Sequence, residues 1–532
     1  MARATIAFVL IWLAAARQGP ATARLPAAAV RAVEAVSADE LHSYVGALAS
    51  DAFRGRGVGD AGNRAAEEFI CATLRASGVT PAGSGGSCYQ AVDVYRPALG
   101  SRPRLVVSNE DGTTLADLSA GVDFYPLLET AEGSVTAPLV YAGHGISAPA
   151  LKHDDYAGVR AANAIVLVRE GVPDSVSSGG ALSETEVTAP ASVARKIADA
   201  RAHGARGVLI IGGFLAGSRT VWPESASVRD ADFRLLSALR DSTLVAATLS
   251  EKAAAPVLRA LEAHRALAAS LSPDLQISPV TMHNVLGIVE GRDDSHRGEM
   301  VVLGAHLDHD GTDAEGRIYN GADDNASGTA AVLAAAAAFA RAAAAGERPA
   351  RAVLFAFWNG EEKGSLGAQA FVAAPQPGRH IIANLNLDMV GRHEEVLDPA
   401  DWRFHGLPKI AASATGNTLH VLGYSRTPEL AALVRAANDA VGLTLQEDYD
   451  NGALGLLQRS DQWAFLAHGI PALFLTTGLH PDYHTPADDT DRIDFGKLTR
   501  VAKLAARSAW IVAESPEPAL RRRSDFFLHR HK

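Results

Sequence analysis

The feature that most constrains this 532-residue chain is a set of short, almost uninterrupted apolar runs in its second half. Four segments have this character: Met300–His306, Ala350–Glu362, Asn384–Gly391 and Gly469–Gly478. A strand that is apolar at nearly every position is buried on both faces, which is typical of a sheet covered by helices. Between the first two runs, the alanine-rich stretch Thr329–Gly346 favours a helix that ends at glycine. The alternation predicts an α/β fold with a mixed, largely parallel twisted sheet flanked by helices.

A separate unit is expected between residues 137 and 271. Short apolar strands are predicted at Val140–Ile146, Ala164–Glu170 and Gly207–Gly213, and a helix at Lys196–Ala205. The Gly- and Ser-rich stretch Ser175–Glu184 is expected to be a loop. This region contains no clustered set of metal-ligand residues, so we expect a small β-rich inserted domain.

The N-terminal residues resemble an export signal. Arg3 supplies a positive start, Ala4–Ala16 an apolar core, and Ala21–Ala23 a small-residue cleavage site. We therefore expect a periplasmic or extracellular protein, with an uncleaved membrane anchor as the alternative. In that environment, a disulfide between the two cysteines, Cys71 and Cys88, is favoured over free thiols.

The composition narrows the range of partners. The formal net charge is -11, which argues against a protein that binds nucleic acid through a basic face. The basic residues Arg521–Arg523 lie in a C-terminal tail, where we expect a solvated segment. The apolar run near the N-terminus is short for a membrane span, so no stable membrane association is expected.

Ionisable residues recur at the carboxyl ends of the predicted strands, where ligands gather in open α/β sheets. The candidates are His306, Asp308, Glu361, Glu362, Asp388 and His484, together with the adjacent pair Asp323 and Asp324 in the loop before the alanine-rich helix. Each one has an ordinary interpretation on its own: a buried core histidine, a solvated turn or a helix cap. A calcium loop at Asp308–Gly316 is disfavoured, because its sixth position is Asp313 instead of glycine. The convergence of the whole set favours a metal site.

Five motifs in this order carry a family resemblance: GAHLDHDG, NGADDNASG, FWNGEEKGSLG, NLDMVG and PDYHTPADDTDRID. They resemble the di-zinc aminopeptidase family, which includes bacterial leucyl-type aminopeptidases and is related to the glutamate carboxypeptidases. The middle of the chain is similar to a protease-associated domain. The resemblance implies a zinc exopeptidase fold, divided into a signal peptide (1–23), an N-terminal part of the peptidase domain (24–136), an inserted protease-associated domain (137–271), the zinc peptidase catalytic domain (272–515) and a basic C-terminal tail (516–532).

The resemblance also assigns roles to residues. It implies two zinc ions that share Asp324, with His306 and Asp388 on one ion and Glu362 and His484 on the other. Glu361 would be the general base that takes a proton from a water shared by the ions, since neighbouring side chains at a strand end point to opposite sides. Two further positions have expected roles: Asp308 would orient the imidazole of His306, and Tyr483 would donate to the oxyanion.

Several nearby residues receive no ligand role from the motifs. Asp323 is expected to hydrogen-bond the loop backbone, and the relatives often carry a cis peptide at the position of Asp324–Asn325. The remaining expectations concern surplus polar residues near the site (His309, Asp310 and His480), caps of the final helix (Asp488, Asp489 and Asp491) and a segment that could form part of the pocket rim (His393–Asn417).

The expected function is that of an exported di-zinc metallo-aminopeptidase that removes N-terminal residues from peptides. A carboxypeptidase or dipeptidase on the same metal core is the alternative, and it would need a basic pocket for which Arg392, Arg403 and Arg426 are candidates. Glutaminyl cyclisation and a non-catalytic binding protein are less favoured, because all five ligands and the base are present. The sequence leaves open the preferred side chain, the oligomeric state and the native metal.

Overall fold

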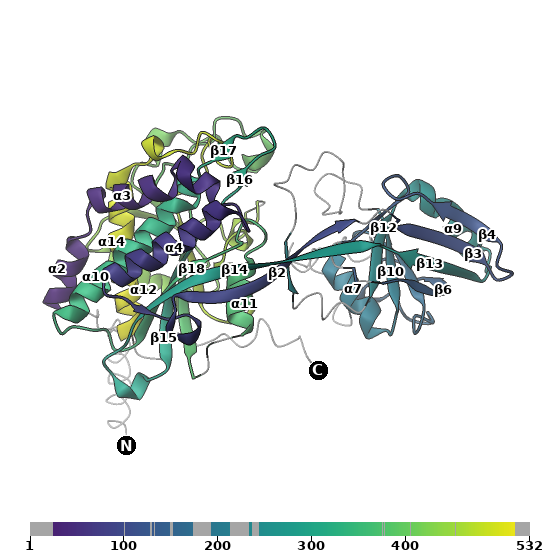
Figure 1. The fold of residues 1–532 in the computed structure, drawn as a ribbon, viewed down its shortest axis with the longest axis horizontal. Helices are drawn as coiled ribbons and strands as arrows, with labels where there is room; N and C mark the ends of the chain where they lie inside the picture. Colours follow the sequence, from purple (N-terminus) through teal and green to yellow (C-terminus); the bar gives the residue numbers. More distant parts are fainter. Residues whose placement is uncertain are drawn as a thin grey trace, which may run out of the picture. The chain divides into compact units, whose positions relative to one another are not determined.

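The computed structural model describes residues 25–99, 102–127, 130–131, 133–148, 153–173, 193–212, 233–236, 244–374, 376, 378–404, 406–452 and 454–515. The expected signal peptide, the loop Ser175–Glu184 and the tail from residue 516 lie outside these ranges. The chain divides into two compact units (Figure 1). Unit 1 combines Met1–Val92 with Met282–Lys532, and unit 2 is Asp93–Thr281. The chain leaves unit 1 within strand β2 (Tyr89–Leu99) and returns within β14 (Leu275–Val289).

These limits differ from the expected ones, because unit 2 begins well before residue 137. Strand β13 (Leu267–Ser272) pairs on one side with β6 (Val135–Tyr141) and on the other with β3 (Arg104–Asn109). The segment around β3 therefore belongs to the inserted unit and not to the N-terminal part of the peptidase domain. Pairing between strands so far apart in the chain leaves no trace in local composition.

Unit 2 is built on one mixed sheet. Its strand order is β4-β3-β13-β6-β9-β10-β12-β5, and the run from β6 to β12 is parallel. The other strands of this sheet are β4 (Thr114–Leu118), β5 (Phe124–Pro126), β9 (Ile165–Arg169), β10 (Gly207–Ile211) and β12 (Val245–Leu249), and the helices are α7 (Val193–Ala202) and α9 (Glu251–Glu262). The short strands β7 (Ser147–Ala148), β8 (His153–Asp154) and β11 (Arg234–Leu235) lie outside this sheet. The unit is β-rich, as the sequence predicts.

Unit 1 contains the mixed, largely parallel sheet that the apolar runs predict. Its order is β14-β18-β15-β19-β22-β20-β21, with β2 and β1 (Thr80–Pro81) on β14. The strands from β18 to β22 are parallel, whereas β14–β18 and β20–β22 are antiparallel. The strand bounds are β18 (Ala352–Trp358), β15 (Glu299–His306), β19 (His380–Leu387), β22 (Ala472–Thr476), β20 (Thr418–Leu422) and β21 (Thr444–Gln446).

Helices cover both faces of this sheet, so its strands are apolar throughout. Along β15, Val301 and Leu303 join one hydrophobic cluster, while Met300 and Val302 join the other, because successive side chains point to opposite faces. The first cluster includes residues of α2 (Ala27–Glu34), α3 (Ala38–Leu48), α4 (Ala61–Ala76), α10 (Gly328–Ala344), α12 (Pro428–Asn438) and α14 (Phe495–Glu514) (Figure 1). The second includes α11 (Leu366–Ala373) and α13 (Gln462–Ala467).

The alanine-rich helix α10 lies inside the first cluster. Its side chains are buried at almost every position, and their small size lets it pack closely against its neighbours. Among the described residues, the helical stretch Ala322–Ala344 is also the one long and apolar enough to cross a membrane, but 89% of that window is buried within the protein. The burial identifies α10 as a core helix.

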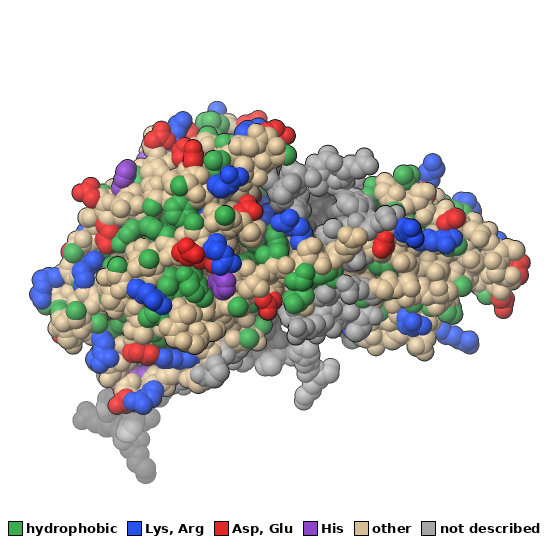
Figure 2. All heavy atoms as spheres, viewed as in Figure 1, with side chains coloured by type: hydrophobic (Ala, Val, Ile, Leu, Met, Phe, Trp, Pro, Cys, Tyr) green, Lys and Arg blue, Asp and Glu red, His purple; other side chains and the backbone are tan. Residues whose placement is uncertain are grey.

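The outer surface is mixed in charge and apolar character. Figure 2 shows acidic and basic side chains interspersed over the face in view. Among the described residues, the exposed large hydrophobic side chains are Val122, Tyr141 and Leu397.

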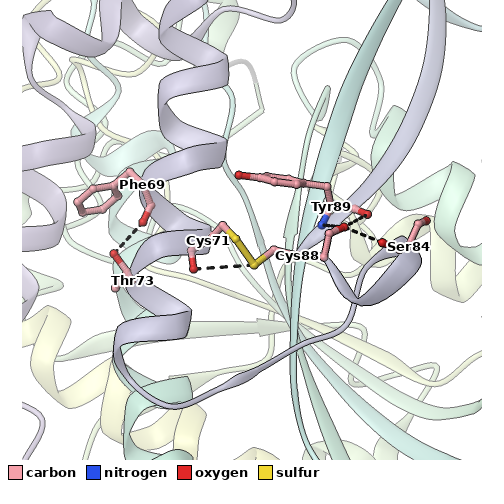
Figure 3. Close-up of a disulfide and its surroundings, with 7 residues drawn as sticks. Phe69, Cys71, Thr73, Ser84, Cys88 and Tyr89 are labelled. Carbon is pink, nitrogen blue, oxygen red and sulfur yellow. Dashed lines mark hydrogen bonds between the residues drawn. A yellow bond between two sulfur atoms is a disulfide. The ribbon is translucent and has the colours of Figure 1, made fainter.

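A disulfide joins Cys71 in α4 to Cys88, immediately before β2 (Figure 3). The S–S distance is 2.06 Å and the Cα–Cα distance is 5.7 Å, so the prediction of a disulfide over free thiols is confirmed. The bond ties the helix that precedes the insertion to the strand that leads into it.

Candidate metal centre

The carboxyl ends of the parallel strands bring the predicted residues to one edge of the sheet. His306 is the last residue of β15, and Asp388 directly follows β19. Glu361 and Glu362 lie in the turn after β18, and His484 lies in the loop after β22. Because these strands are parallel neighbours, their ends meet, and ligands far apart in the sequence converge.

The predicted bridge, Asp324, lies in a distorted turn (Ala322–Ser327) just before α10. The Asp324–Asn325 peptide bond is cis, as the resemblance implies. The side chain of Asn325 accepts a hydrogen bond from the amide of Gly328 (2.9 Å) and donates to the main-chain oxygen of Leu387 (2.9 Å). Asn325 thus caps α10 and fixes the loop against the end of β19.

The two oxygens of Asp324 face different partners. Oδ1 lies 3.3 Å from His306 Nε2, and that nitrogen is 3.2 Å from Asp388 Oδ1. Oδ2 lies 3.2 Å from His484 Nε2, which is 3.3 Å from Glu362 Oε2. Ligand atoms bound about 2.0–2.2 Å from one tetrahedral zinc lie roughly 3.3–3.6 Å apart. The two triplets match these ligand spacings closely, and they share one carboxylate.

Burying these ionisable side chains together costs free energy unless cations offset their charges. His306, Asp324 and Asp388 are all buried. Within the described part of the chain, His306 Nε2 and Asp388 Oδ1 have no partner with hydrogen-bond geometry, although they lie close together. Buried polar atoms normally have such partners. A nitrogen and a carboxylate oxygen that lie close together without hydrogen-bond partners fit the ligands of a divalent cation such as zinc.

Asp308 has a different role from the expected one. His306 Nδ1 is within hydrogen-bond distance of the main-chain oxygen of Asp308 (3.2 Å), whereas the nearer recorded carboxylate oxygen, Oδ1, is 3.9 Å away. The Asp308 carboxylate instead accepts the amide hydrogens of Glu361 (3.0 Å) and Glu362 (3.3 Å). The backbone of Asp308 therefore orients the histidine, and its side chain holds the turn that carries the two glutamates.

Two of the surplus residues orient ligands. Asp310 Oδ2 lies 3.1 Å from His484 Nδ1, a carboxylate–imidazole pair that fixes the ring with Nε2 toward Asp324. His309 Nδ1 lies 2.7 Å from Glu362 Oε1. That spacing is a hydrogen-bond length and is shorter than the edge of a zinc tetrahedron. His309 thus occupies one oxygen of Glu362 and leaves the other to face His484.

The neighbouring aspartate, Asp323, does not face the metal ligands, in agreement with the prediction. Its Oδ1 accepts the amide of Gly391 (2.7 Å), and its Oδ2 lies 3.2 Å from His480 Nε2. Asp488 accepts the amide hydrogens of Asp323 and Asp324. The expectation that Asp488 caps the final helix is therefore wrong.

The cap of α14 is Asp494, which accepts the amide of Lys497 (2.9 Å). Asp489 accepts the amide of Thr490 in the short turn before that helix, and the structure shows no cap from Asp491 within the described residues.

The carboxylates of the site differ in pKa because their surroundings differ. Burial raises the pKa of Glu361 well above its usual range, and the carboxylates of Asp461 and Glu362 add to this shift against the opposing charge of His306. Burial alone would also raise the pKa of Asp324, but hydrogen bonds with His306 and His484 hold it well below its usual range. The proposed bridge is thus ionised, whereas Glu361 is a group that can hold a proton.

Asp461 is a residue of this region that the sequence analysis missed. It is fully buried, and neither of its carboxylate oxygens has a hydrogen-bond partner among the described residues. Burial raises its pKa well above the usual range, with nearby carboxylates contributing. It directly precedes α13, at the position where that helix begins, and no motif of the sequence analysis includes it.

A small cavity of about 50 Å³ opens onto the metal-binding residues. Glu361 and Tyr483 line it beside the candidate ligands. Burial raises the pKa of Tyr483, so its phenol is protonated at neutral pH. The other lining residues are Met389, Leu456, Arg459, Phe474, Thr476, Gly478 and Leu479. The cavity therefore combines a polar floor with apolar walls and one arginine.

The three arginines that the sequence offered for a carboxylate pocket are engaged elsewhere. Arg392 pairs with Asp482 (2.9 Å), and Arg403 binds Asp401 (2.7 Å). The guanidinium of Arg426 lies 5.6 Å from the centre of the Trp463 ring. Four residues of the segment expected at the pocket rim, Asp398, Ala400, Asp401 and Arg403, line a separate open groove with His484 and Thr485. The described lining of the cavity at the metal residues includes no residue of that segment.

Comparisons with known proteins agree with this geometry. Residues 284–509 match the model of peptidase family M28. A probable leucine aminopeptidase of Arthroderma benhamiae is 27% identical over 237 residues, which cover 43% of this chain and 57% of that protein. A probable glutamate carboxypeptidase of Arabidopsis thaliana is 30% identical over 218 residues, 40% of this chain and 27% of that protein. The matches thus span about half of these relatives or less.

One solved structure is similar over nearly the whole length. The aminopeptidase from Aneurinibacillus sp. strain AM-1 has 20% sequence identity and a TM-score of 0.52, and the match covers 92% of this chain and 97% of that chain. At this identity the likeness shows a shared fold. The family match covers the strands and loops that carry the site, so residues 284–509 of this chain are similar to peptidase family M28.

Proposed function

We propose that this chain is an exported, zinc-dependent aminopeptidase that hydrolyses N-terminal residues from peptides. The observation that carries the proposal is the carboxylate of Asp324, whose two oxygens each face a separate histidine–carboxylate pair at zinc-ligand spacing. His306 and Asp388 would hold one ion, and Glu362 and His484 the other. When bound, two zinc ions polarise a peptide carbonyl and lower the pKa of water toward neutrality.

The remaining groups of the cavity suit proton transfer. Glu361 lines the cavity, and its raised pKa fits a carboxylate that takes a proton from the attacking water and passes it to the leaving amine. Tyr483 is buried in the same wall with a raised pKa, so its neutral hydroxyl could donate to the oxygen of the tetrahedral intermediate.

Support for the amino end of the substrate comes from the curated relatives named probable leucine aminopeptidases. The carboxylates that line the cavity do not choose between the two ends, because Asp324, Glu362 and Asp388 are assigned to zinc and the two dications would offset their charge.

A carboxypeptidase or dipeptidase is the second candidate, and Arg459 is the observation that favours it. Arg459 is exposed and lines the cavity, and the described residues offer it no ion pair. A guanidinium in that state could bind the free carboxylate of a short substrate.

The test compares four versions of one dipeptide: unmodified, N-acetylated, C-amidated and doubly blocked. An aminopeptidase cleaves the C-amidated form and spares the N-acetylated form, and a chelator abolishes the activity. Cleavage of the N-acetylated form alone would favour the carboxypeptidase, and cleavage limited to the unmodified form would favour a dipeptidase. Glu361→Gln should retain zinc while turnover falls about 100–10,000-fold; unchanged turnover would remove Glu361 from its role.

Export and the identity of unit 2 belong to the same proposal. The signal-like residues 1–23 support export, and the Cys71–Cys88 disulfide is compatible with an oxidising compartment. The β-rich unit 2 is consistent with a protease-associated domain. Fractionation of the native host, with N-terminal sequencing of the mature protein, tests export directly, and a cytoplasmic protein with an intact N-terminus would refute it.

A further inference from the structure

One buried arginine, Arg56, links the segments that carry His306 and Asp324, two of the three residues of the first metal triplet. It lies at the end of a short turn (Asp51–Arg56) in the N-terminal stretch, outside every motif of the metal site. Its side chain is 1% exposed. All its hydrogen bonds go to main-chain oxygens: Nε to Leu307 (2.8 Å), Nη1 to Leu48 (2.7 Å) and Asn320 (2.6 Å), and Nη2 to Gly321 (2.9 Å) and Asp324 (3.4 Å).

Four of these acceptors lie in the segments that carry His306 and Asp324, and the fifth, Leu48, is the last residue of α3. Leu307 stands between His306 and Asp308 at the end of β15. Asn320, Gly321 and Asp324 belong to the loop that carries the bridge. A guanidinium has five donors in a rigid planar fork, and here all five are used. One rigid group therefore sets the spacing between the backbone of His306 and the backbone of Asp324.

The main chain of Arg56 is pressed against the same loops. A Cβ atom at Gly55 would lie 2.4 Å from the main-chain oxygens of Gly311 and Tyr319, so the turn is packed directly against the backbone of these two residues. The main-chain oxygen of Arg56 accepts hydrogen bonds from Asn63 Nδ2 (2.9 Å) and from the amide of His309 (3.3 Å). The contact thus continues to the histidine that holds Glu362.

Arg56 is also a buried cation, because a guanidinium group stays protonated at neutral pH. None of the hydrogen bonds of this buried cation goes to a carboxylate. Its counter-charges are the acidic residues of the metal centre, at longer range.

We propose that Arg56 is a positioning residue of the metal centre. It holds the loops of His306 and Asp324 at the separation that a zinc ion needs, and its charge stabilises the cluster of carboxylates before the ion arrives. The N-terminal stretch thus takes part in metal binding although it supplies no ligand. This inference rests on the proposed function only in taking zinc as the ion.

The test uses Arg56→Lys, which keeps the charge but loses the fork, and Arg56→Met, which loses both. Arg351→Met is the matched control: Arg351 is also 1% exposed, lies in the same unit, and bonds the main-chain oxygen of Ser515 (2.6 Å) and the carboxylate of Glu299. Zinc affinity is measured by chelator competition, thermal unfolding is followed with and without zinc, and the visible spectrum of the cobalt-loaded protein reports ligand geometry.

We expect Arg56→Lys to weaken zinc binding about 10–100-fold, with a smaller zinc-induced rise in Tm and an altered cobalt spectrum. Arg56→Met should weaken it further, or fail to fold, in which case Arg56→Lys decides. Arg351→Met should lower Tm equally with and without zinc at unchanged affinity. If Arg56→Lys behaves in the same way as this control, Arg56 is only structural and the inference is overturned. A wild-type chain that takes up no zinc would instead overturn the proposed function, and this inference with it.

Discussion

Replacing Gly321 by alanine should damage the metal centre through steric contact. A Cβ atom at this position would lie 2.1 Å from the main-chain oxygen of Asp324 and 2.5 Å from Cδ2 of His309. The residue also has φ of 58°, where a side chain costs about 1–2 kcal/mol. Overpacking adds about 1–3 kcal/mol. We expect a stability loss of about 2–5 kcal/mol and weaker zinc binding, because the displaced atoms belong to the bridge and to the histidine that orients Glu362.

The assay is urea unfolding of the zinc-free and zinc-loaded protein, combined with zinc affinity from chelator competition. Gly316→Ala is the matched control, since Gly316 has φ of 81° and no atom lies within 4 Å of its added Cβ. This control should lose only the conformational part, about 1–2 kcal/mol, and keep its zinc affinity. If both variants lose the same stability and both bind zinc normally, the contact at Gly321 does not shape the metal site and the reasoning fails.

Three further outcomes are expected. Asp310→Asn weakens the acceptor 3.1 Å from the metal-site imidazole and should lower zinc affinity about 10–100-fold in chelator competition; unchanged affinity would contradict its orienting role. Cys88→Ala should lower the free energy of unfolding by about 3 kcal/mol, measured with urea, because the disulfide spans 17 residues, and a wild-type protein under reductant should match it. Burial lowers the pKa of His420, but hydrogen bonds with Asp448 and Glu394 outweigh burial and raise this pKa to about 9. The protonated His420 therefore stabilises the fold fully below about pH 6.5, and this stabilisation is lost as the pH rises through 9. The stability difference between wild type and His420→Gln should therefore shrink by about 3 kcal/mol over that range, and a constant difference would refute the assignment.

The sheet of unit 1 and the ligands at its edge could be predicted because both depend on local features. A strand buried on both faces is apolar at consecutive positions, as in β15, and a parallel neighbour forces the carboxyl ends together. His306 and Asp388 therefore had to lie near each other once their strands were recognised. The bridge followed from motif resemblance, because the loop of Asp324 has no strand periodicity.

The groups that orient the ligands could not be predicted, because their roles depend on distant contacts. Arg56 and Leu307 are 251 residues apart in the chain, so no local sequence pattern predicts their hydrogen bond. Asp308 was expected to orient His306 because the two residues are close in the sequence. Its carboxylate instead accepts hydrogen bonds from two backbone amides in the turn after β18, which is distant in the sequence. The limit of unit 2 was misplaced for a similar reason, since β3 and β13 pair across most of the insertion.

The passage of the chain out of unit 1 at β2 and back at β14 has a consequence for the order of synthesis. A ribosome completes Arg56, Cys71 and Cys88 and then makes all of Asp93–Thr281 before the first metal ligand emerges. At about 5–20 residues per second, that interval lasts on the order of ten to forty seconds. Helix α4 has no sheet to cover it during this time, and the disulfide is a link that the early stretch can form from its own residues.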